Sequence, residues 1–199
     1  YITLNLRPAW KPAFVRSFEP CMYMFQYFQA STGKFQEGVW TVIPMIVRMN
    51  DNSTLETFVN MHRQNPERNF SLAGIGIAQD EYQYTRYAFR YASDQSYKYA
   101  GSMQGEWGNY YNGGLTQYSL SFRINPIPHI LFAGTGTWNK FENVGINKES
   151  KEIYLLSPEI RLSLNPRVHL NLFYQYNSYT EIAAFNVRAS YEFTPLSYI

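Results

Sequence analysis

The chain has 199 residues, of which 45% are hydrophobic and 18% aromatic, and its formal net charge at pH 7 is +2. This small charge, carried by dispersed basic residues, gives no indication of nucleic-acid binding, and the single cysteine, Cys21, excludes a disulfide framework within the chain. No stretch approaches the roughly 18 consecutive apolar residues of a transmembrane helix.

The mean hydropathy of -0.37 is typical of a soluble protein. A transmembrane β-barrel has a similarly low average, because its strands alternate apolar with polar residues. Composition therefore leaves two classes open, a soluble β-sandwich and a membrane barrel.

Apolar and polar residues alternate with the two-residue period of β-strands along most of the chain. The pattern predicts about eleven strands, at 1–7, 14–29, 35–49, 54–64, 82–92, 97–108, 115–125, 129–140, 153–164, 168–177 and 181–193, with a further strand beginning at Leu196. Most of these are about 10 residues or longer, whereas soluble sheets usually have strands of five or six and membrane strands need roughly 9 to 11. Strand length therefore favours a membrane barrel.

Short turns and longer loops alternate between the predicted strands. The short turns, rich in Pro, Asn, Asp and Ser, are 7–12, 50–53, 93–96, 125–128, 165–167 and 194–195, and the longer loops include 65–81, 109–114 and 141–152. Outer-membrane barrels have short periplasmic turns and longer outer loops, so the alternation assigns the two sets to opposite sides of a membrane. The longest loop, 65–81, is a candidate for function, but its residues select neither an inward constriction nor a cover for a partner.

Aromatic residues gather towards the predicted strand ends. Tyr and Trp favour positions where one side of the ring is wet and the other apolar. We therefore predict two interfacial girdles, one of Trp107, Tyr110, Tyr111, Tyr176 and Tyr179 and an opposite one of Trp10, Phe193 and Tyr198. The alternative is a soluble sheet, which cross-strand aromatic pairs also stabilise.

The polar faces of the predicted strands carry charges of both signs. The lumen-facing candidates are Arg7, Arg48, Glu56, Lys98, Glu106, Arg123, Glu159, Arg161, Arg188 and Glu192. An arginine facing lipid costs about 2 to 4 kcal/mol at the membrane midplane, so these charges indicate the wall of a water-filled or plugged lumen. They either form paired charges that line the interior or set the selectivity of a pore, and their near balance names no preferred ion.

The sequence shows no distinct catalytic or metal-binding constellation. The histidines His62, His129 and His169 lie on different predicted strands without a second ligand at metal spacing. His169 and Asn171 share a strand face near several serines, as a membrane hydrolase of the Ser-His-Asn type requires, but a polar face rich in Ser and Asn produces many such matches. We expect no catalytic residue, metal or cofactor, and keep a membrane-embedded hydrolase as the weaker alternative.

Several segments in order along the chain resemble one protein family. They read RPAWKPAFVRSFEP, AQDEYQYTRYAFRYASDQSYKYAGSMQGEWGNYYNGG, LNPRVHLNLFYQYNS and NVRASYEFTPLSYI. They are similar to the C-terminal region of large outer-membrane proteins of Bacteroidetes-type bacteria with a domain of unknown function. In that family, a module similar to family-9 carbohydrate-binding domains precedes a long β-barrel region.

The resemblance implies a bacterial outer-membrane location and supplies no catalytic residues. Family members continue by roughly two strands past the position of Ile199. The resemblance therefore implies that residues 1–199 are the C-terminal part of a barrel domain, without its final strands and without the N-terminal module.

These observations predict an all-β, antiparallel, up-and-down transmembrane β-barrel, of which this chain is one part. The expected function is that of a channel or of the membrane anchor of a carbohydrate-related surface protein. The expected partners are the lipid bilayer with its lipopolysaccharide, other outer-membrane subunits, and a glycan bound through the absent module. The alternatives are a scaffold subunit of a larger outer-membrane complex, the hydrolase, and a soluble carbohydrate-binding β-sandwich.

Overall fold

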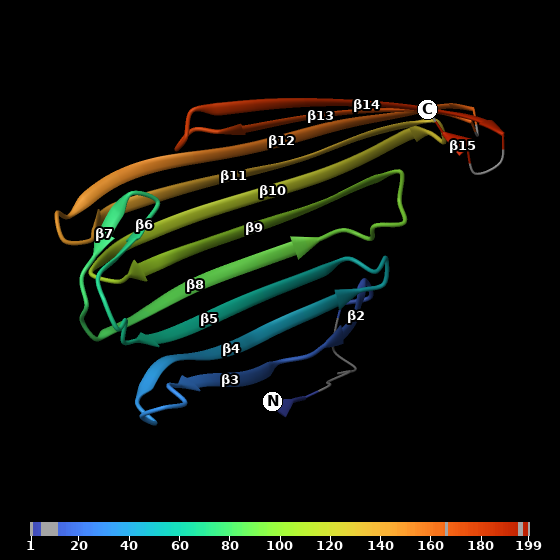
Figure 1. Ribbon diagram of the computed structural model, residues 1–199. Coiled ribbons are helices and arrows are strands. Elements are labelled where there is room, and N and C mark those ends of the chain that lie inside the picture. Colours follow the sequence, from blue (N-terminus) through green and yellow to red (C-terminus); the bar gives the residue numbers. More distant parts are fainter. Residues whose placement is uncertain (1, 5–11, 166, 195–196, 199) are drawn as a thin grey trace. The chain divides into compact units, whose positions relative to one another are not determined.

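The structure is a computed structural model that describes residues 2–4, 12–165, 167–194 and 197–198 (Figure 1). These residues form strands, turns and loops, and no helix occurs among them. Within the described ranges, no helix is long and apolar enough to span a membrane.

The strands fall into one large sheet and one small hairpin. They are β1 (Ile2–Thr3), β2 (Val15–Phe18), β3 (Cys21–Phe28), β4 (Phe35–Met49), β5 (Thr54–Gln64), β6 (Phe70–Leu72), β7 (Ile75–Ile77), β8 (Tyr82–Ala92), β9 (Tyr99–Tyr110), β10 (Gly113–Ile127), β11 (Ile130–Val144), β12 (Glu149–Asn165), β13 (Val168–Asn177), β14 (Ile182–Thr194) and β15 (Ser197–Tyr198). The large sheet has 13 strands in the order β1-β3-β4-β5-β8-β9-β10-β11-β12-β13-β14-β15, with β2 paired to β4, while β6 and β7 pair with each other. The order is an open path among the described residues, and the predicted all-β antiparallel fold is confirmed at this level.

Four predicted strands, 35–49, 54–64, 82–92 and 168–177, coincide with β4, β5, β8 and β13. The predicted strand 14–29 is instead divided into β2 and β3, which both pair with β4. Pro20 lies at the division. Proline has no N–H to donate to a sheet, which accounts for the interruption there. The strands on either side of loop 141–152 are longer than predicted, so that only residues 145–148 separate β11 from β12.

The chain divides into two compact units. Unit 1 comprises Tyr1–Ala92, Gln104–Tyr118 and Asn139–Glu152, and unit 2 comprises Ser93–Met103, Ser119–Trp138 and Ile153–Ile199.

Unit 1 has two chemically different sheet faces, which the strand registers define. On one face, Tyr23, Thr41, Asn60 and Arg86 lie in a row across β3, β4, β5 and β8. On the opposite face, the neighbouring row is Met24, Trp40, Met61 and Thr85. We call the first the polar face and the second the apolar face. Side chains alternate across a strand, so each face continues along its strands.

The register of β4 changes between Val42 and Met45, where β4 carries a bulge opposite β5. Pro44 lies within this bulge, a position where the missing N–H removes no ladder bond. Beyond the bulge, Ile46 lies opposite Glu56 and Arg48 opposite Thr54. On a regular strand, residues an odd number of positions apart lie on opposite faces. The bulge changes this for Arg48, which lies on the same polar face as Thr41.

Unit 2 repeats the division between faces. Arg161, Asn171 and Arg188 lie opposite one another on β12, β13 and β14, and Leu162, Leu170 and Ala189 form the adjacent row. The alternation predicted for 159–164 and 170–176 is therefore confirmed by the pairing of these strands.

Candidate functional site

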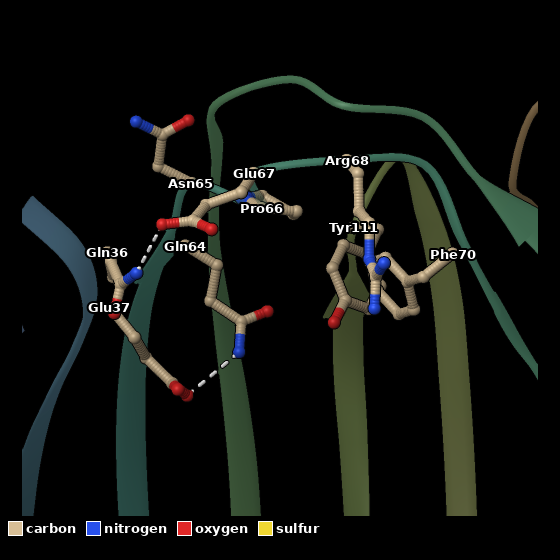
Figure 2. Close-up of a pocket in the computed structure, with 9 residues that line it drawn as sticks. All are labelled: Gln36, Glu37, Gln64, Asn65, Pro66, Glu67, Arg68, Phe70 and Tyr111. Carbon is tan, nitrogen blue, oxygen red and sulfur yellow. Dashed lines mark hydrogen bonds between the residues drawn. The ribbon is translucent and has the colours of Figure 1, made fainter. Parts of the chain in front are cut away.

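A cleft of about 370 Å³ opens among the loops of unit 1 (Figure 2). Its walls come from β4, from the end of β5 and the segment after it, from β6, and from the turn between β9 and β10. The lining residues are Gln36, Glu37, Gln64, Asn65, Pro66, Glu67, Arg68, Phe70 and Tyr111. The longest predicted loop therefore supplies much of the lining of this cleft.

Side-chain amides fix the two carboxylates of this cleft. Gln36 Nε2 donates to Glu67 Oε1 at 2.7 Å, and Gln64 Nε2 donates to Glu37 Oε1 at 2.9 Å. The hydroxyl of Tyr84 in turn donates to Gln64 Oε1 at 3.0 Å. Figure 2 shows the Arg68 guanidinium on the other side, beside the rings of Tyr111 and Phe70. The cleft is thus acidic on one side and aromatic on the other.

Tyr111 connects the cleft to an aromatic cluster. Its ring lies edge-on to Tyr82 at 5.0 Å and to Tyr110 at 4.8 Å, and 5.9 Å from Phe70. Burial is the main cause that raises the pKa of Tyr111 to about 12, with Tyr110, Glu37 and Tyr82 adding to it. The backbone of Tyr111 has a φ of 51°, in a turn that β9 and β10 share.

The β6–β7 hairpin holds the loops of unit 1 together. Ile75 and Ile77 are buried, and Ile146 N donates to the carbonyl oxygen of Gly76 at 2.8 Å. Lys151 Nζ donates to the carbonyl oxygen of Ala73 at 3.1 Å. Segment 65–81 is therefore not an open loop but a hairpin packed on the β11–β12 turn, with bonds to main-chain atoms.

Asn112 fixes the same turn from the β9–β10 side. Its Nδ2 donates to the carbonyl oxygen of Gly145 at 2.9 Å, and Gly145 N donates to its Oδ1 at 2.8 Å. Gly145 has a φ of +84°, and a Cβ there would collide with the carbonyl oxygen of Gly76 and lie 2.6 Å from Ile75 Cγ2. Only glycine fits this conformation and this close approach.

Three of the predicted lumen residues form ion pairs in unit 1. Arg48 pairs with Glu19 at 2.9 Å, Glu56 with Arg90 at 3.4 Å, and Glu106 with Arg86 at 2.6 Å. The Arg86 side chain is 5% exposed and its guanidinium lies 5.2 Å from the centre of the Tyr110 ring. These three predicted residues are therefore paired with opposite charges, while their position in a lumen stays a prediction.

The partners Glu19, Arg86 and Arg90 were not predicted from the sequence. The sequence does place Arg86 and Arg90 on one face of the strand, because both lie at even positions of 82–92, together with Tyr82 and Tyr84. The odd positions of that strand also carry aromatic residues, so its polar face could not be chosen from composition. The ring of His62, one of the three histidines without a second ligand at metal spacing, stacks on Tyr84 at 4.9 Å.

The predicted lumen residues of unit 2 lie in several settings. Glu159 and Arg161 bond each other at 2.6 and 3.1 Å, Arg188 lies opposite Asn171, and Arg123 lines a depression on this unit. Lys98 is exposed before β9, where its carbonyl oxygen accepts from Asn125 N at 2.7 Å. Arg7 lies outside the described residues, as does the side chain of Glu192.

The predicted girdle residues also lie in several different settings. Trp107 is 42% exposed and its ring lies 6.2 Å from that of Phe89 on the apolar face of unit 1, whereas Tyr110 and Tyr111 are partly buried in the aromatic cluster. In unit 2, Tyr179 and Phe193 are exposed, and Tyr176 lies opposite Leu156 and Ala183. Trp10 and the side chain of Tyr198 are outside the described residues.

One serine of unit 2 lies within hydrogen-bond distance of a histidine. Ser163 Oγ is 3.1 Å from His169 Nδ1, and the two residues lie opposite each other on β12 and β13. Asn171 shares their strand face. For metal binding, no group of three or more His, Cys, Asp or Glu side chains occurs in the part of the chain that the structure describes.

Comparison with known proteins gives no assignment, since no family model, no curated protein and no solved structure matches the chain. The contrast between the two faces of unit 1 is therefore the main feature of the described residues that bears on function.

Proposed function

We propose that this chain forms part of an outer-membrane β-barrel that acts as a channel or as the membrane anchor of a surface protein, with no catalysis in residues 1–199. Membership of the bacterial outer-membrane family described above belongs to this proposal, as do contacts with lipid and lipopolysaccharide. One observation carries it, namely that unit 1 buries the charged side chain of Arg86 on its polar face and exposes large apolar side chains such as Met24 and Trp40 on the opposite face.

Several of the large exposed side chains lie on the apolar face, whereas Phe25 and Tyr27 are exposed on the polar face. Met24 is 55% and Trp40 45% exposed, whereas Arg86 on the other face is 4% and Thr41 2% exposed. In water, a continuous apolar surface of this kind marks an interaction site. In a membrane strand, the same side chains face hydrocarbon.

The apolar face also contains a shallow groove of about 430 Å³. Ile2, Met22, Met24, Trp40 and Met61 contribute to its walls, and its lining is almost entirely apolar. Methionine side chains are flexible and suit an irregular apolar partner, which supports contact with lipid acyl chains.

Strand length gives independent support. β5 and β8 have 11 residues each, and β4 has 15. A tilted strand needs roughly 9 to 11 residues to cross the hydrocarbon layer, so each of these strands is long enough.

The polar face supports an interior that contains water. A depression of about 520 Å³ lies over it, lined among others by Glu37, Asn60, His62 and Glu106. Because the arginines of this face are paired, its charges favour a structural lining over strong ion selectivity. A channel therefore needs a continuous water path, whereas an anchor does not.

The test is refolding of the chain into detergent micelles and liposomes. We expect it to require detergent for solubility and to float with liposomes in a density gradient. A monomer that stays soluble without detergent would overturn the membrane proposal. Single-channel conductance of the full-length protein in planar bilayers would then support a channel, and stable co-purifying subunits without conductance would support the scaffold alternative.

A membrane-embedded hydrolase is a second candidate because Ser163 Oγ lies 3.1 Å from His169 Nδ1. In this arrangement the imidazole accepts the serine proton and the hydroxyl oxygen attacks an ester carbonyl. Turnover of a short-chain ester by the refolded chain that is lost in both Ser163→Ala and His169→Ala would support it. Equal turnover in wild type and Ser163→Ala would exclude this pair.

A further inference from the structure

Unit 2 has a depression of about 420 Å³ on its polar face. Hydroxyl side chains of three strands line it, namely Ser121 on β10, Thr135 on β11 and Ser157 on β12. Arg123, Glu159 and Phe173 are also among its lining residues, and we call this depression the Arg123 pocket. It lies wholly within unit 2.

Arg123 has a polar atom without a partner. Its Nε is buried and makes no hydrogen bond among the described residues. A buried donor of this kind is rare in folded proteins, and a bound ion or water commonly accounts for it. An arginine presents its N–H groups as a planar fork that fits the oxygens of a carboxylate or phosphate.

The carboxylate in the same pocket is already neutralised. Arg161 Nε donates to Glu159 Oε1 at 2.6 Å and Arg161 Nη2 donates to Glu159 Oε2 at 3.1 Å. With both oxygens of Glu159 engaged by one guanidinium, little negative charge opposes an anion at Arg123.

Among the side chains that the structure describes, the surrounding polar face has an excess of positive charge. Across β10, β12, β13 and β14, the described charged side chains of the register rows are Arg123, Arg161 and Arg188 against Glu159. Unit 1 differs, because each of its polar-face arginines Arg48, Arg86 and Arg90 has a glutamate partner. A guanidinium whose Nε has no hydrogen-bond partner among the described residues, beside hydroxyl groups, is the chemistry that holds an oxyanion. The Ser121 hydroxyl is bonded to Ser102 Oγ at 2.7 Å, so it donates to the anion while it accepts from Ser102.

We propose that the Arg123 pocket binds the oxyanion group of a small solute, a carboxylate or a phosphate, between the Arg123 fork and the hydroxyls of Ser121 and Ser157. The binding site goes beyond the proposed function and rests on unit 2 alone, so it holds whether or not the barrel conducts. In a channel, it would give the interior a preference for anionic solutes.

The test measures binding by calorimetry to the full chain, refolded in an uncharged detergent at constant ionic strength. The probes are acetate, inorganic phosphate and uncharged acetamide. We expect saturable binding of acetate, phosphate or both, and none of acetamide. Acetate alone identifies a carboxylate site and phosphate alone a phosphate site, while the absence of saturable binding of either anion overturns the proposal.

Two variants with the same charge change separate the pocket from general electrostatics. Arg123→Gln should weaken binding by about tenfold to a hundredfold, as expected for loss of a charge-assisted hydrogen bond. Arg167→Gln, at an exposed position in the β12–β13 turn, should leave binding unchanged. Equal losses in the two variants would show unspecific attraction and overturn the site.

Two further variants cover the case in which Arg123→Gln does not fold. Arg123→Lys keeps the charge but not the planar fork, so it should lose more affinity for acetate than for phosphate. Ser157→Leu keeps Arg123 and fills the depression, and wild-type affinity in this variant would contradict the assigned position.

Discussion

Arg86 and Glu106 form a 2.6 Å ion pair in which the arginine side chain is 5% exposed and the glutamate 19%. The two residues lie 20 positions apart in the sequence and belong to β8 and β9. Taking one charge away from such a pair leaves the other buried without compensation, which makes the pair a sensitive test of the fold.

Glu106→Gln should lower the free energy of unfolding by about 3 to 5 kcal/mol, because the Arg86 charge stays buried without its partner. Urea unfolding of the refolded chain, followed by tryptophan fluorescence, measures this change. The matched control is Glu81→Gln, which breaks the 2.8 Å pair with Arg63, where both side chains are about half exposed. Equal destabilisation of the two variants would show that Arg86 is not buried as described.

Trp40→Arg should reduce folding into liposomes, because an arginine facing lipid costs about 2 to 4 kcal/mol near the midplane. The folded fraction is measured by its altered migration in unheated gel samples. Tyr27→Arg is the control, since Tyr27 is also exposed but lies on the polar face opposite Glu37. If the two substitutions reduce folding equally, the apolar face does not contact lipid.

Gly145→Ala should detach the β6–β7 hairpin, because the new Cβ collides with the Gly76 carbonyl and the φ of +84° is strained for alanine. The strain alone costs about 1 to 2 kcal/mol. Limited trypsin digestion should then cut faster after Arg68. Gly33→Ala provides the comparison, since Gly33 has a φ of +67° but nothing within 4 Å of an added Cβ. The same cleavage rate in both variants would exclude the close contact with Gly76.

Alkaline pH should loosen the aromatic cluster through Tyr111. Its pKa is about 12 in the folded chain and about 10 in an unfolded one, so folding favours the neutral phenol. The stabilisation is therefore complete below pH of about 10 and is lost between about 10 and 12. Tyrosinate absorbance of wild type minus that of Tyr111→Phe gives the titration of this one residue. A midpoint near 10 would show that Tyr111 is not buried.

Alternation together with the flanking turn residues predicted β4, β5, β8 and β13 to the residue. It could not predict the ion pairs. Which charges meet depends on the register, and the bulge around Pro44 shifts the register of β4 against β5. The face of Arg86 was equally hidden, since both faces of 82–92 carry tyrosines.

The cleft beside segment 65–81 could be predicted from the sequence only in part. The length of 65–81 marked it as a candidate, and alternating Phe70, Leu72, Ile75 and Ile77 around Ala73-Gly74 gave a signal for the hairpin. The joining of Tyr111 to Glu37 and Phe70 could not be predicted, because three segments distant in sequence must first fold together. The same limit applies to Arg123, because the lack of a hydrogen-bond partner for its Nε can be recognised only when the positions of its neighbours are known.

The bond from Ile146 N to Gly76 O and the two bonds from Asn112 to Gly145 all end on main-chain atoms of the hairpin or the turn. Exposed side chains nearby, such as that of Asn147, take no part in these bonds. The β6–β7 hairpin and the β11–β12 turn of unit 1 are thus held together through main-chain atoms, so their exposed side chains can be substituted without loss of these bonds. This surface is therefore suited to sequence diversification, because new exposed residues there leave the main-chain hydrogen bonds beneath them intact.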